Sequence, residues 1–456
     1  MSVRFSETLQ RTRVALSAQP WHGKLEKATI IRDVNGRIHL FLEGYRPTDE
    51  ERRLLDESLS REDALGPYWT RDIWVPTQKE EQPDRPLPAM WELIRKQRGP
   101  APWETEAGRP TWYVLERHVA KQSWTERPAA QQPPWPMDQV GQGRAPAVVA
   151  CFSFKGGVGR TTVTAATGLV LARHGHRVAL VDLDLEAPGL ALLFLGPKDD
   201  HTGVIDYLVE KPVQGKNWVM RESVHVLTDS VLLGDEGVPL RLVPVGSVDA
   251  DYLEKLARVD LQSLTGASLN GILSGLLREL DATVPGGLDF ILLDARAGFH
   301  ELGGLALCEL AHAAIVLGIH SAQGWAGLRE VVRRAAKPEQ EEGLPVVLVH
   351  AMAPPIGQPG EEIERKGFLE QAYDLFSECY YREGEVPDLN DPDQPHVPLV
   401  LPWQLELRGN LLLSVESQGV EQVKSLVRRL TDGPCLALAE RLCVLLGRSL
   451  RREARE

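Results

Sequence analysis

The chain has 456 residues, so two domains are expected, because a single hydrophobic core rarely grows that large. Its net charge is −13. Residues 1–140 carry 21 basic and 21 acidic side chains, so the whole acidic excess lies after residue 140. An acidic surface repels the phosphate backbone, which disfavours nucleic acid as a partner. The five cysteines form no CxxC pair, which excludes the familiar zinc and iron–sulfur spacings. Neither a signal-peptide pattern nor an apolar run of 18 residues occurs, and together with the scattered cysteines this predicts a cytoplasmic protein.

The first part of the chain predicts a small α+β domain over residues 1–125. Two apolar runs on either side of the turn Val34-Asn-Gly-Arg37 indicate a β-hairpin. Residues 48–65 have a helical pattern, and residues 109–124 contain a further strand. We expect about three strands and two helices here. Eight of the eleven tryptophans lie before residue 146, where they either pack in the core of this domain or form an aromatic surface for a partner.

Residues 126–145 are rich in Pro, Gln and Gly and lack an apolar period, which indicates a linker. From residue 146 to residue 456, apolar strands alternate with amphipathic helical stretches. Alternation of this kind predicts a three-layer α/β domain with a mostly parallel sheet covered on both faces. The predicted strands lie within residues 145–154, 177–183, 240–245, 288–295, 313–319, 344–351 and 397–402.

A glycine-rich loop follows the first of these strands and leads directly into a helix. The loop reads Lys155-Gly-Gly-Val-Gly-Arg160-Thr161-Thr162. Its three glycines, Gly156, Gly157 and Gly159, allow backbone N–H groups on either side of Val158 to surround phosphate oxygens, and the helix adds the positive end of its dipole. Thr161 stands where a hydroxyl binds Mg²⁺. This order of strand, loop, helix and hydroxyls favours a P-loop nucleotide site over a glycine turn without a ligand.

The loop departs from the common GxxxxGK[ST] pattern, with Phe154 in place of the first glycine and Arg160 in place of the lysine. A lysine directly before Gly-Gly resembles the deviant Walker A signature of the ParA/MinD-type ATPases, and the arginine is similar to their KGGVGR variant subgroup. In that family the signature lysine reaches the nucleotide of a second subunit, which implies the same role for Lys155 and a homodimer formed around ATP. Arg160 can neutralise phosphate charge, but its planar head differs from that of lysine, so binding is easier to predict than rapid hydrolysis.

Carboxylates follow the next strand in the segment Asp182-Leu-Asp184-Leu-Glu186. The resemblance implies that Asp182 helps to hold the Mg²⁺ shell and that Asp184 positions the attacking water, a task that Glu186 could also perform. Carboxylates at the carboxyl end of a parallel strand face the ligand crevice, and phosphoryl transfer needs both a metal and an oriented nucleophile. The alternative is that Asp182 and Asp184 only cap the turn after the strand.

The strand at residues 288–295 resembles a Walker B strand that ends at Asp294, which would reach Mg²⁺ through water. Gly298 occupies the family's γ-phosphate-sensing position. Arg296 is unusual there; a transition-state cation, a dimer contact and a solvated loop charge are all open. The last strand resembles the segment that borders the purine in relatives, so Pro402 and Trp403 are expected at the base.

The C-terminal segment carries an apolar stripe of Leu438, Leu442, Leu445 and Leu446 and ends in arginines. MinD has a membrane-targeting helix in this position. The acidic residues among the arginines, and the continuity with the domain, favour a docked final helix instead, so no stable membrane association is predicted.

These features together predict an ATP-binding and ATP-hydrolysing switch that uses Mg²⁺, dimerises and regulates an unidentified protein partner, in bacterial signalling, partitioning or anti-phage defence. One alternative is a nucleotide-dependent scaffold that does not hydrolyse ATP because Arg160 disables turnover. Another is an ATP-dependent amide-forming ligase, although no substrate motif is recognisable.

Overall fold

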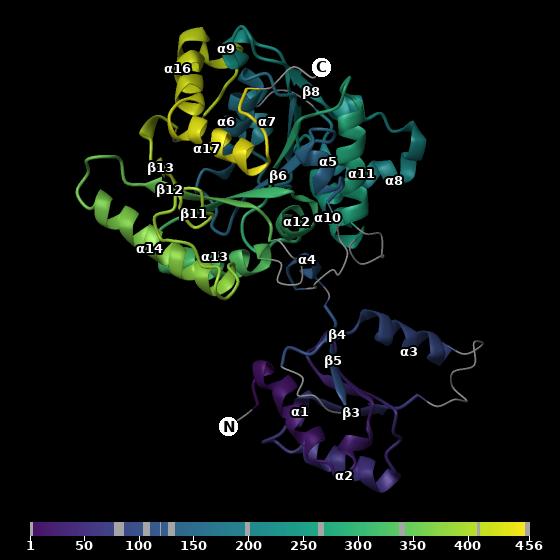
Figure 1. The fold of residues 1–456 in the computed structure, drawn as a ribbon. Coiled ribbons are helices and arrows are strands. Elements are labelled where there is room, and N and C mark those ends of the chain that lie inside the picture. The colour runs from purple at the N-terminus through teal and green to yellow at the C-terminus, as the bar shows by residue number, and fades with distance from the viewer. Residues whose placement is uncertain are drawn as a thin grey trace. The chain divides into compact units, whose positions relative to one another are not determined.

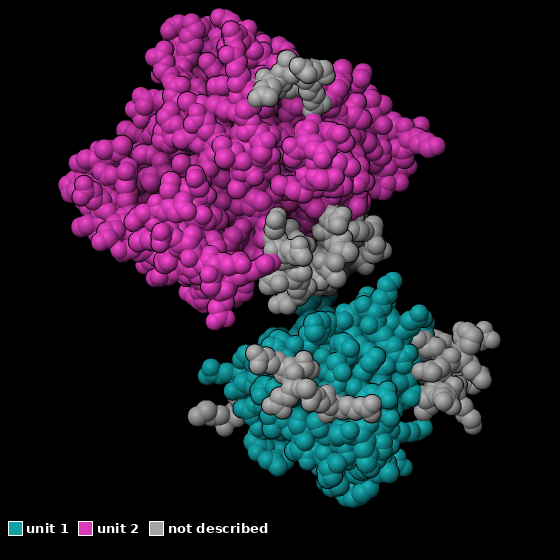
Figure 2. All heavy atoms as spheres, viewed as in Figure 1, with its two compact units in different colours: residues 1–120 teal, residues 121–456 magenta. Residues whose placement is uncertain are grey.

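A computed structural model of the chain divides into two compact units, residues 1–120 (unit 1) and residues 121–456 (unit 2) (Figure 2). The structure describes residues 3–76, 86–103, 110–118, 120–125, 133–196, 201–262, 269–336, 343–407 and 411–451. Among these residues, no helix is both long and apolar enough to cross a membrane. Residues 126–132, which belong to the expected linker, lie outside the described ranges, whereas residues 133–145 include a short helix whose Val140 is fully buried in unit 2.

Unit 1 is built on a five-stranded sheet with the order β3-β2-β1-β5-β4. The bounds are Lys27–Arg32 for β1, Ile38–Glu43 for β2, Trp69–Trp74 for β3, Gly99–Pro100 for β4 and Thr111–Glu116 for β5. The predicted hairpin is the antiparallel pair β1 and β2, and β5 lies parallel to β1. Its helices are α1 (Thr8–Ser17), α2 (Asp49–Ser60) and α3 (Pro86–Gln97). The described part of the unit is therefore an α+β domain, with two more strands and one more α-helix than expected.

The tryptophans of unit 1 are mostly core residues. Four of them are less than a tenth exposed: Trp21, Trp69, Trp91 and Trp112. An indole buries a large apolar area, which suits a domain this small. Packing, rather than an exposed aromatic surface, accounts for these four side chains.

Unit 2 contains an eight-stranded sheet with the order β13-β12-β11-β6-β10-β7-β9-β8 (Figure 1). The bounds are Ala147–Ser153 for β6, Val178–Asp182 for β7, His225–Leu227 for β8, Leu240–Val243 for β9, Phe290–Asp294 for β10, Ala313–Gly318 for β11, Val346–Ala353 for β12 and Leu399–Pro402 for β13. All neighbouring pairs are parallel except β8 with β9. The seven predicted strands and the parallel sheet are confirmed, and β8 is an addition.

Helices cover both faces of this sheet, which makes unit 2 a three-layer α/β domain as predicted. One core contains side chains of α6, α7, α9, α16 and α17, and the other contains side chains of α8 and of α10 to α14. The helix bounds are Gln122–Thr125 for α4, Met137–Gly141 for α5, Arg160–Arg173 for α6, Leu190–Phe194 for α7, Val204–Gln214 for α8, Ser230–Leu233 for α9, Tyr252–Gln262 for α10, Leu269–Ala282 for α11, Glu301–Leu305 for α12, Ala322–Ala335 for α13, Glu361–Cys379 for α14, Val415–Gln418 for α15, Val420–Thr431 for α16 and Pro434–Leu445 for α17. A π-helical turn, Ala306–Leu310, continues α12.

The central strand β6 explains why the strands of unit 2 have almost continuous apolar sequences. Its successive side chains point into opposite cores, with Val148, Ala150 and Phe152 in one and Ala147, Val149 and Cys151 in the other. All seven residues of β6 are buried. Because both faces are covered, nearly every position of such a strand selects an apolar side chain, and the exception in β6 is Ser153 at its carboxyl end.

Candidate functional site

The glycine loop lies between the end of β6 and the start of α6. Gly157 and Gly159 adopt the left-handed conformation, with φ of +74° and +88°. A Cβ added at Gly156, Gly157 or Gly159 would meet no atom within 4 Å. The loop therefore exposes its backbone at the N-terminus of a 14-residue helix, where N–H groups and the helix dipole favour an anion.

Lys155 is partly buried at the start of this loop. Its carbonyl oxygen accepts a hydrogen bond from Ser153 Oγ at 2.9 Å, which helps to fix the chain where it leaves β6. No ion pair of its ammonium group occurs among the described residues. The sequence assigned Lys155 a role at a second subunit, and in the single chain its side chain has no carboxylate partner within the described ranges.

Arg160 is buried and contacts two carboxylates. Its Nη2 donates to Asp184 Oδ2 at 2.6 Å, and its Nε donates to Asp294 Oδ1 at 2.9 Å. Thr161 Oγ1 donates to the other oxygen of Asp294 at 2.6 Å. Arg160 is only 9% exposed, so this guanidinium compensates carboxylates that solvent barely reaches. The structure thus brings together four residues that the sequence selected, but it directs the arginine toward carboxylates.

Asp182 shapes the loop that carries Asp184. Its Oδ1 accepts the backbone N–H of Asp184 at 3.0 Å, and its Oδ2 accepts those of Gly189 and Leu190, also at 3.0 Å. Burial, followed by repulsion from Asp294 on the adjoining strand, raises the pKa of Asp182 to about 7. Burial also raises the pKa of Asp294, against the opposing effect of Arg160. In this structure the Asp182 carboxylate caps the turn after β7, which is the alternative that the sequence left open for this residue.

The loop that follows β10 is tied to the loop that follows β7. Arg296 Nη2 lies 2.7 Å from Glu186 Oε2, and its Nη1 lies 3.8 Å from Asp184 Oδ1. His300 Nε2 lies 3.3 Å from the other oxygen of Glu186. Gly298, with φ of +73°, donates its N–H to Ser153 O at 3.2 Å. Arg296 therefore makes an ion pair within the chain, and Asp184 has a cation on each side.

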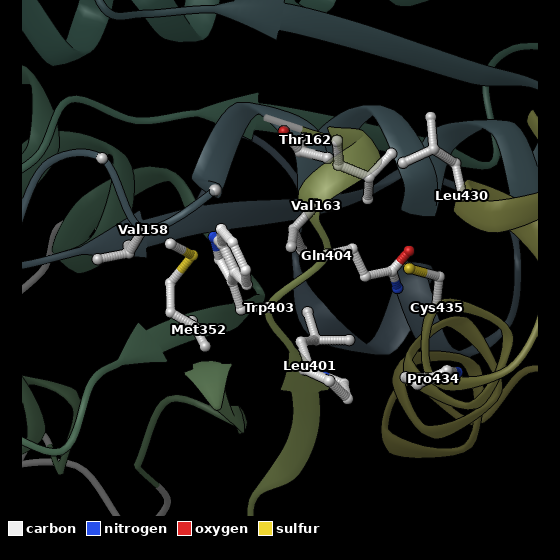
Figure 3. A pocket seen from close by; sticks show the side chains of 15 residues that line it. Val158, Thr162, Val163, Met352, Leu401, Trp403, Gln404, Leu430, Pro434 and Cys435 are labelled. Atoms are coloured by element: carbon white, nitrogen blue, oxygen red, sulfur yellow. The ribbon is translucent and has the colours of Figure 1, made fainter. Parts of the chain in front are cut away.

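A cavity of about 290 Å³ opens beside the glycine loop (Figure 3). It is mostly apolar, and its lining residues are Gly157, Val158, Gly159, Thr162, Val163, Ala351, Met352, Leu401, Pro402, Trp403, Gln404, Leu407, Leu430, Pro434 and Cys435. In Figure 3, Met352 and Trp403 lie toward Val158, and Leu430 and Cys435 lie toward the opposite end. A flat apolar ligand attached to phosphates at the loop would fit such a space.

Sequence reasoning selected Pro402 and Trp403 for this cavity but missed most of its wall. Met352 lies at the register shift between Ala351 and Ala353 of β12, with φ of +56°, which no residue pattern reveals. Leu430 and Cys435 come from α16 and α17, which are distant from the loop in sequence. Gly433-Pro434, a break between two helical patterns, is the one local signal that a turn occurs there.

The residues present fit Mg²⁺ only together with nucleotide phosphates. Thr161 and Asp294 supply a hydroxyl and a carboxylate beside the open loop. Within the described ranges, no group of three or more His, Cys, Asp or Glu side chains could hold a metal ion. Mg²⁺ commonly keeps several waters and binds through one or two carboxylates plus substrate phosphates, so this sparse donor set suits it.

Comparisons with known proteins agree with this geometry. The family described as the CobQ/CobB/MinD/ParA nucleotide binding domain matches residues 149–433. The chloroplastic MinD homolog of Arabidopsis thaliana is 51% identical over 51 residues, which are 11% of this chain and 16% of that protein. The antiactivator FleN of Pseudomonas aeruginosa is 38% identical over 115 residues, 24% of this chain and 34% of that protein.

Among solved structures, the septum site-determining protein MinD of Pyrococcus horikoshii, complexed with Mg-ADP, is 21% identical with a TM-score of 0.37. The similarity covers 62% of this chain and 95% of that one. The chain thus spans about a third or less of the length of these two relatives, whereas the family match extends over more than half of this chain. The chain belongs to the CobQ/CobB/MinD/ParA nucleotide-binding domain family.

Proposed function

We propose that this protein is a switch driven by Mg-ATP, in which ATP binding joins two copies of the chain and hydrolysis separates them. The observation that carries the proposal is the continuity of the site. An open glycine loop, a hydroxyl–carboxylate pair and an apolar cavity adjoin one another in unit 2. These are the three surfaces that a nucleotide needs, for its phosphates, its metal and its base.

The proposed roles follow the position of each group. The backbone of residues 156–162 binds the phosphates, Thr161 and Asp294 hold Mg²⁺, and Pro402 with Trp403 covers the base. When bound, Mg²⁺ would neutralise phosphate charge during the transfer. Asp182 acts through the loop that it shapes rather than as a direct ligand.

The remaining roles concern hydrolysis and assembly. Asp184 orients the attacking water, and Gly298 senses the γ-phosphate with its backbone N–H. Lys155 reaches the nucleotide of the second copy, which is consistent with the absence of a carboxylate partner for it among the described residues of one chain. Unit 1, or a separate protein, responds to the state of this dimer, and the acidic charge of the later part of the chain favours a protein over a nucleic acid.

A second candidate function is a scaffold that binds ATP without hydrolysing it. The Arg160 guanidinium holds Asp184 at 2.6 Å, and Arg296 lies on its other side. A carboxylate engaged in this way is not free to orient water. Hydrolysis therefore requires Arg160 to leave Asp184, and the energy of that buried ion pair slows turnover.

Phosphate release measured on purified protein separates the two candidates. The switch predicts Mg²⁺-dependent release that Asp184→Asn abolishes while binding of a fluorescent ATP analogue persists. The control is Asp374→Asn, which removes an exposed carboxylate on α14 and should leave turnover unchanged. Tight binding with no turnover in the unaltered protein would favour the scaffold, and failure to bind any nucleotide would contradict both.

A further inference from the structure

The segment through which the chain enters unit 2 lies on the loop that follows β10. Lys121 donates its backbone N–H to Glu301 Oε2 at 2.5 Å, and Trp124 Nε1 donates to His300 O at 2.7 Å. Arg334 Nη2 donates to Ser123 O at 3.3 Å. Residues 121–125 are thus attached to the start of α12 and to α13 by their backbone and by one indole.

Aromatic packing extends this attachment to the glycine loop. The Trp124 ring lies 5.4 Å from that of Phe152 and 5.1 Å from that of Phe299, which in turn lies 5.0 Å from that of Phe154. Phe154 directly precedes Lys155. The contacts therefore run from the entry segment, across the loop after β10, to the residue directly before the glycine loop.

Two details of the backbone belong to this attachment. A Cβ added at Gly304 would lie 2.6 Å from Trp124 Nε1, so only glycine on this turn of α12 leaves room for the indole. Lys121 has φ of +66°, a conformation that costs energy for a residue with a side chain. Such strain persists only where surrounding contacts hold it, and here Glu301 captures the strained amide.

We propose that Trp124 transmits the nucleotide state from the loop at residues 295–300 to the segment that joins unit 1 to unit 2. The inference rests on the proposed function, because it takes Gly298 as the group that meets the γ-phosphate. In this structure the Gly298 N–H donates to Ser153 O. It cannot donate fully to a phosphate oxygen without turning away from that carbonyl.

The direction of the effect follows from chain connectivity. Phe299 and His300 come directly after Gly298 and supply the ring and the carbonyl oxygen that hold Trp124. Turning Gly298 toward a γ-phosphate displaces both, so Mg-ATP loosens the entry segment and Mg-ADP leaves it docked. Because coupling is reciprocal, releasing Trp124 must favour ATP over ADP by the same factor.

Hydrogen exchange of the full-length protein tests this inference. The amides of Trp124 and Thr125 both donate to Lys121 O and report on the docked segment, and the peptide 153–164 reports on the glycine loop. We expect exchange at residues 121–125 to be about 5-fold faster or more with Mg-ATPγS than with Mg-ADP, the lower end of usual coupling factors. Equal exchange in both states, with the glycine loop protected by each nucleotide, would overturn the inference alone.

Variants of the seat for Trp124 complete the experiment. Gly304→Ala should make exchange at residues 121–125 rapid in both states and raise the affinity for ATPγS relative to ADP by the factor seen in the unaltered protein. Gly141→Ala is the matched control, since a Cβ there meets no atom within 4 Å. If Gly304→Ala does not fold, Trp124→Phe removes the bond to His300 while keeping an aromatic ring. An unchanged nucleotide preference in the folded variant would contradict the inference, and lack of protection at residues 153–164 would overturn the proposed function as well.

Discussion

At the scale of single residues, Arg160 sets the electrostatics of the site. Asp182, Asp184 and Asp294 are all less than a tenth exposed, and carboxylates gathered in this way repel one another unless a cation compensates them. The forked guanidinium reaches Asp184 with one nitrogen and Asp294 with another. A lysine has a single ammonium group and cannot reproduce that bridge.

Arg160→Lys should therefore release Asp184 and increase ATP turnover. We expect kcat to rise about tenfold, which corresponds to roughly 1.4 kcal/mol of barrier, because the carboxylate no longer has to break a buried ion pair. Steady-state phosphate release measures it. Arg173→Lys, at the other end of α6, is the control, since Arg173 donates to Leu232 O away from the site. A lower kcat with unchanged ATP affinity would instead assign Arg160 a direct role in phosphoryl transfer.

His350 gives a prediction about pH. It is fully buried in β12, its ring lies 4.0 Å from that of Phe368, and burial lowers its pKa to about 4. Glu364 Oε1 is 3.4 Å away, but that carboxylate is 36% exposed, so water screens it. Between pH 6.5 and pH 4 the unfolded chain binds a proton that the folded chain excludes, and stability falls as the pH falls.

When the pH is lowered from 7 to 5, the free energy of unfolding of the unaltered protein should therefore fall by about 2 kcal/mol more than that of the His350→Leu protein. This difference follows from the lower pKa of His350 in the folded chain. Denaturant titrations at the two pH values measure this difference. Parallel losses of stability in both proteins would mean that His350 is not the group responsible.

The sequence selected residues that the structure brings together, but it did not predict their contacts. Strand ends and a glycine loop identify Asp182, Asp294 and the phosphate site, because local patterns determine those elements. Arg160 bonds to Asp184, which is 24 positions away in the sequence, and to Asp294, which is 134 positions away. The direction of such a long side chain depends on all its neighbours, so local sequence patterns do not reveal it. Trp124 was likewise indistinguishable in sequence from the core tryptophans of unit 1.

At the scale of elements, the strands with long apolar runs in unit 2 were predictable, and the very short edge strands β4 and β8 were not. The predicted strands of unit 2 have runs of Val, Ile and Leu that leave no alternative. β8 has three residues, and β4 has two, one of them Pro100. Short edge strands carry little apolar pattern because few of their side chains enter a core.

The final helix, α17, docks on the domain as its apolar stripe predicted. Leu438 and Leu442 are fully buried against the core that contains α6, and the same helix brings Cys435 to the cavity. Leu442→Ala should lower the free energy of unfolding by about 3 kcal/mol, the usual cost of a cavity of that size. Val444→Ala, at a position that is 75% exposed, is the control and should change it little. Equal small effects, measured by denaturant titration, would mean that α17 does not stabilise the fold.

At the scale of the whole molecule, the proposed switch requires two copies of the chain. Lys155→Ala should retain binding of a fluorescent ATP analogue to within a few-fold but abolish ATP-dependent dimerisation, since the loop backbone binds phosphate within one chain and the lysine acts on the other. Sedimentation velocity with Mg-ATP measures the assembly. Lys216→Ala, in an exposed turn, is the control. If the Lys155→Ala protein dimerises normally with Mg-ATP, Lys155 does not act on the nucleotide of the second copy.

Light scattering of the Asp184→Asn protein measures ATP-dependent dimerisation directly, because this variant should bind Mg-ATP without consuming it. We expect twice the monomer mass of 50.6 kDa with Mg-ATP, and the monomer mass with Mg-ADP or with ATP and a chelator. A protein that binds Mg-ATP and still scatters as a monomer would contradict the switch.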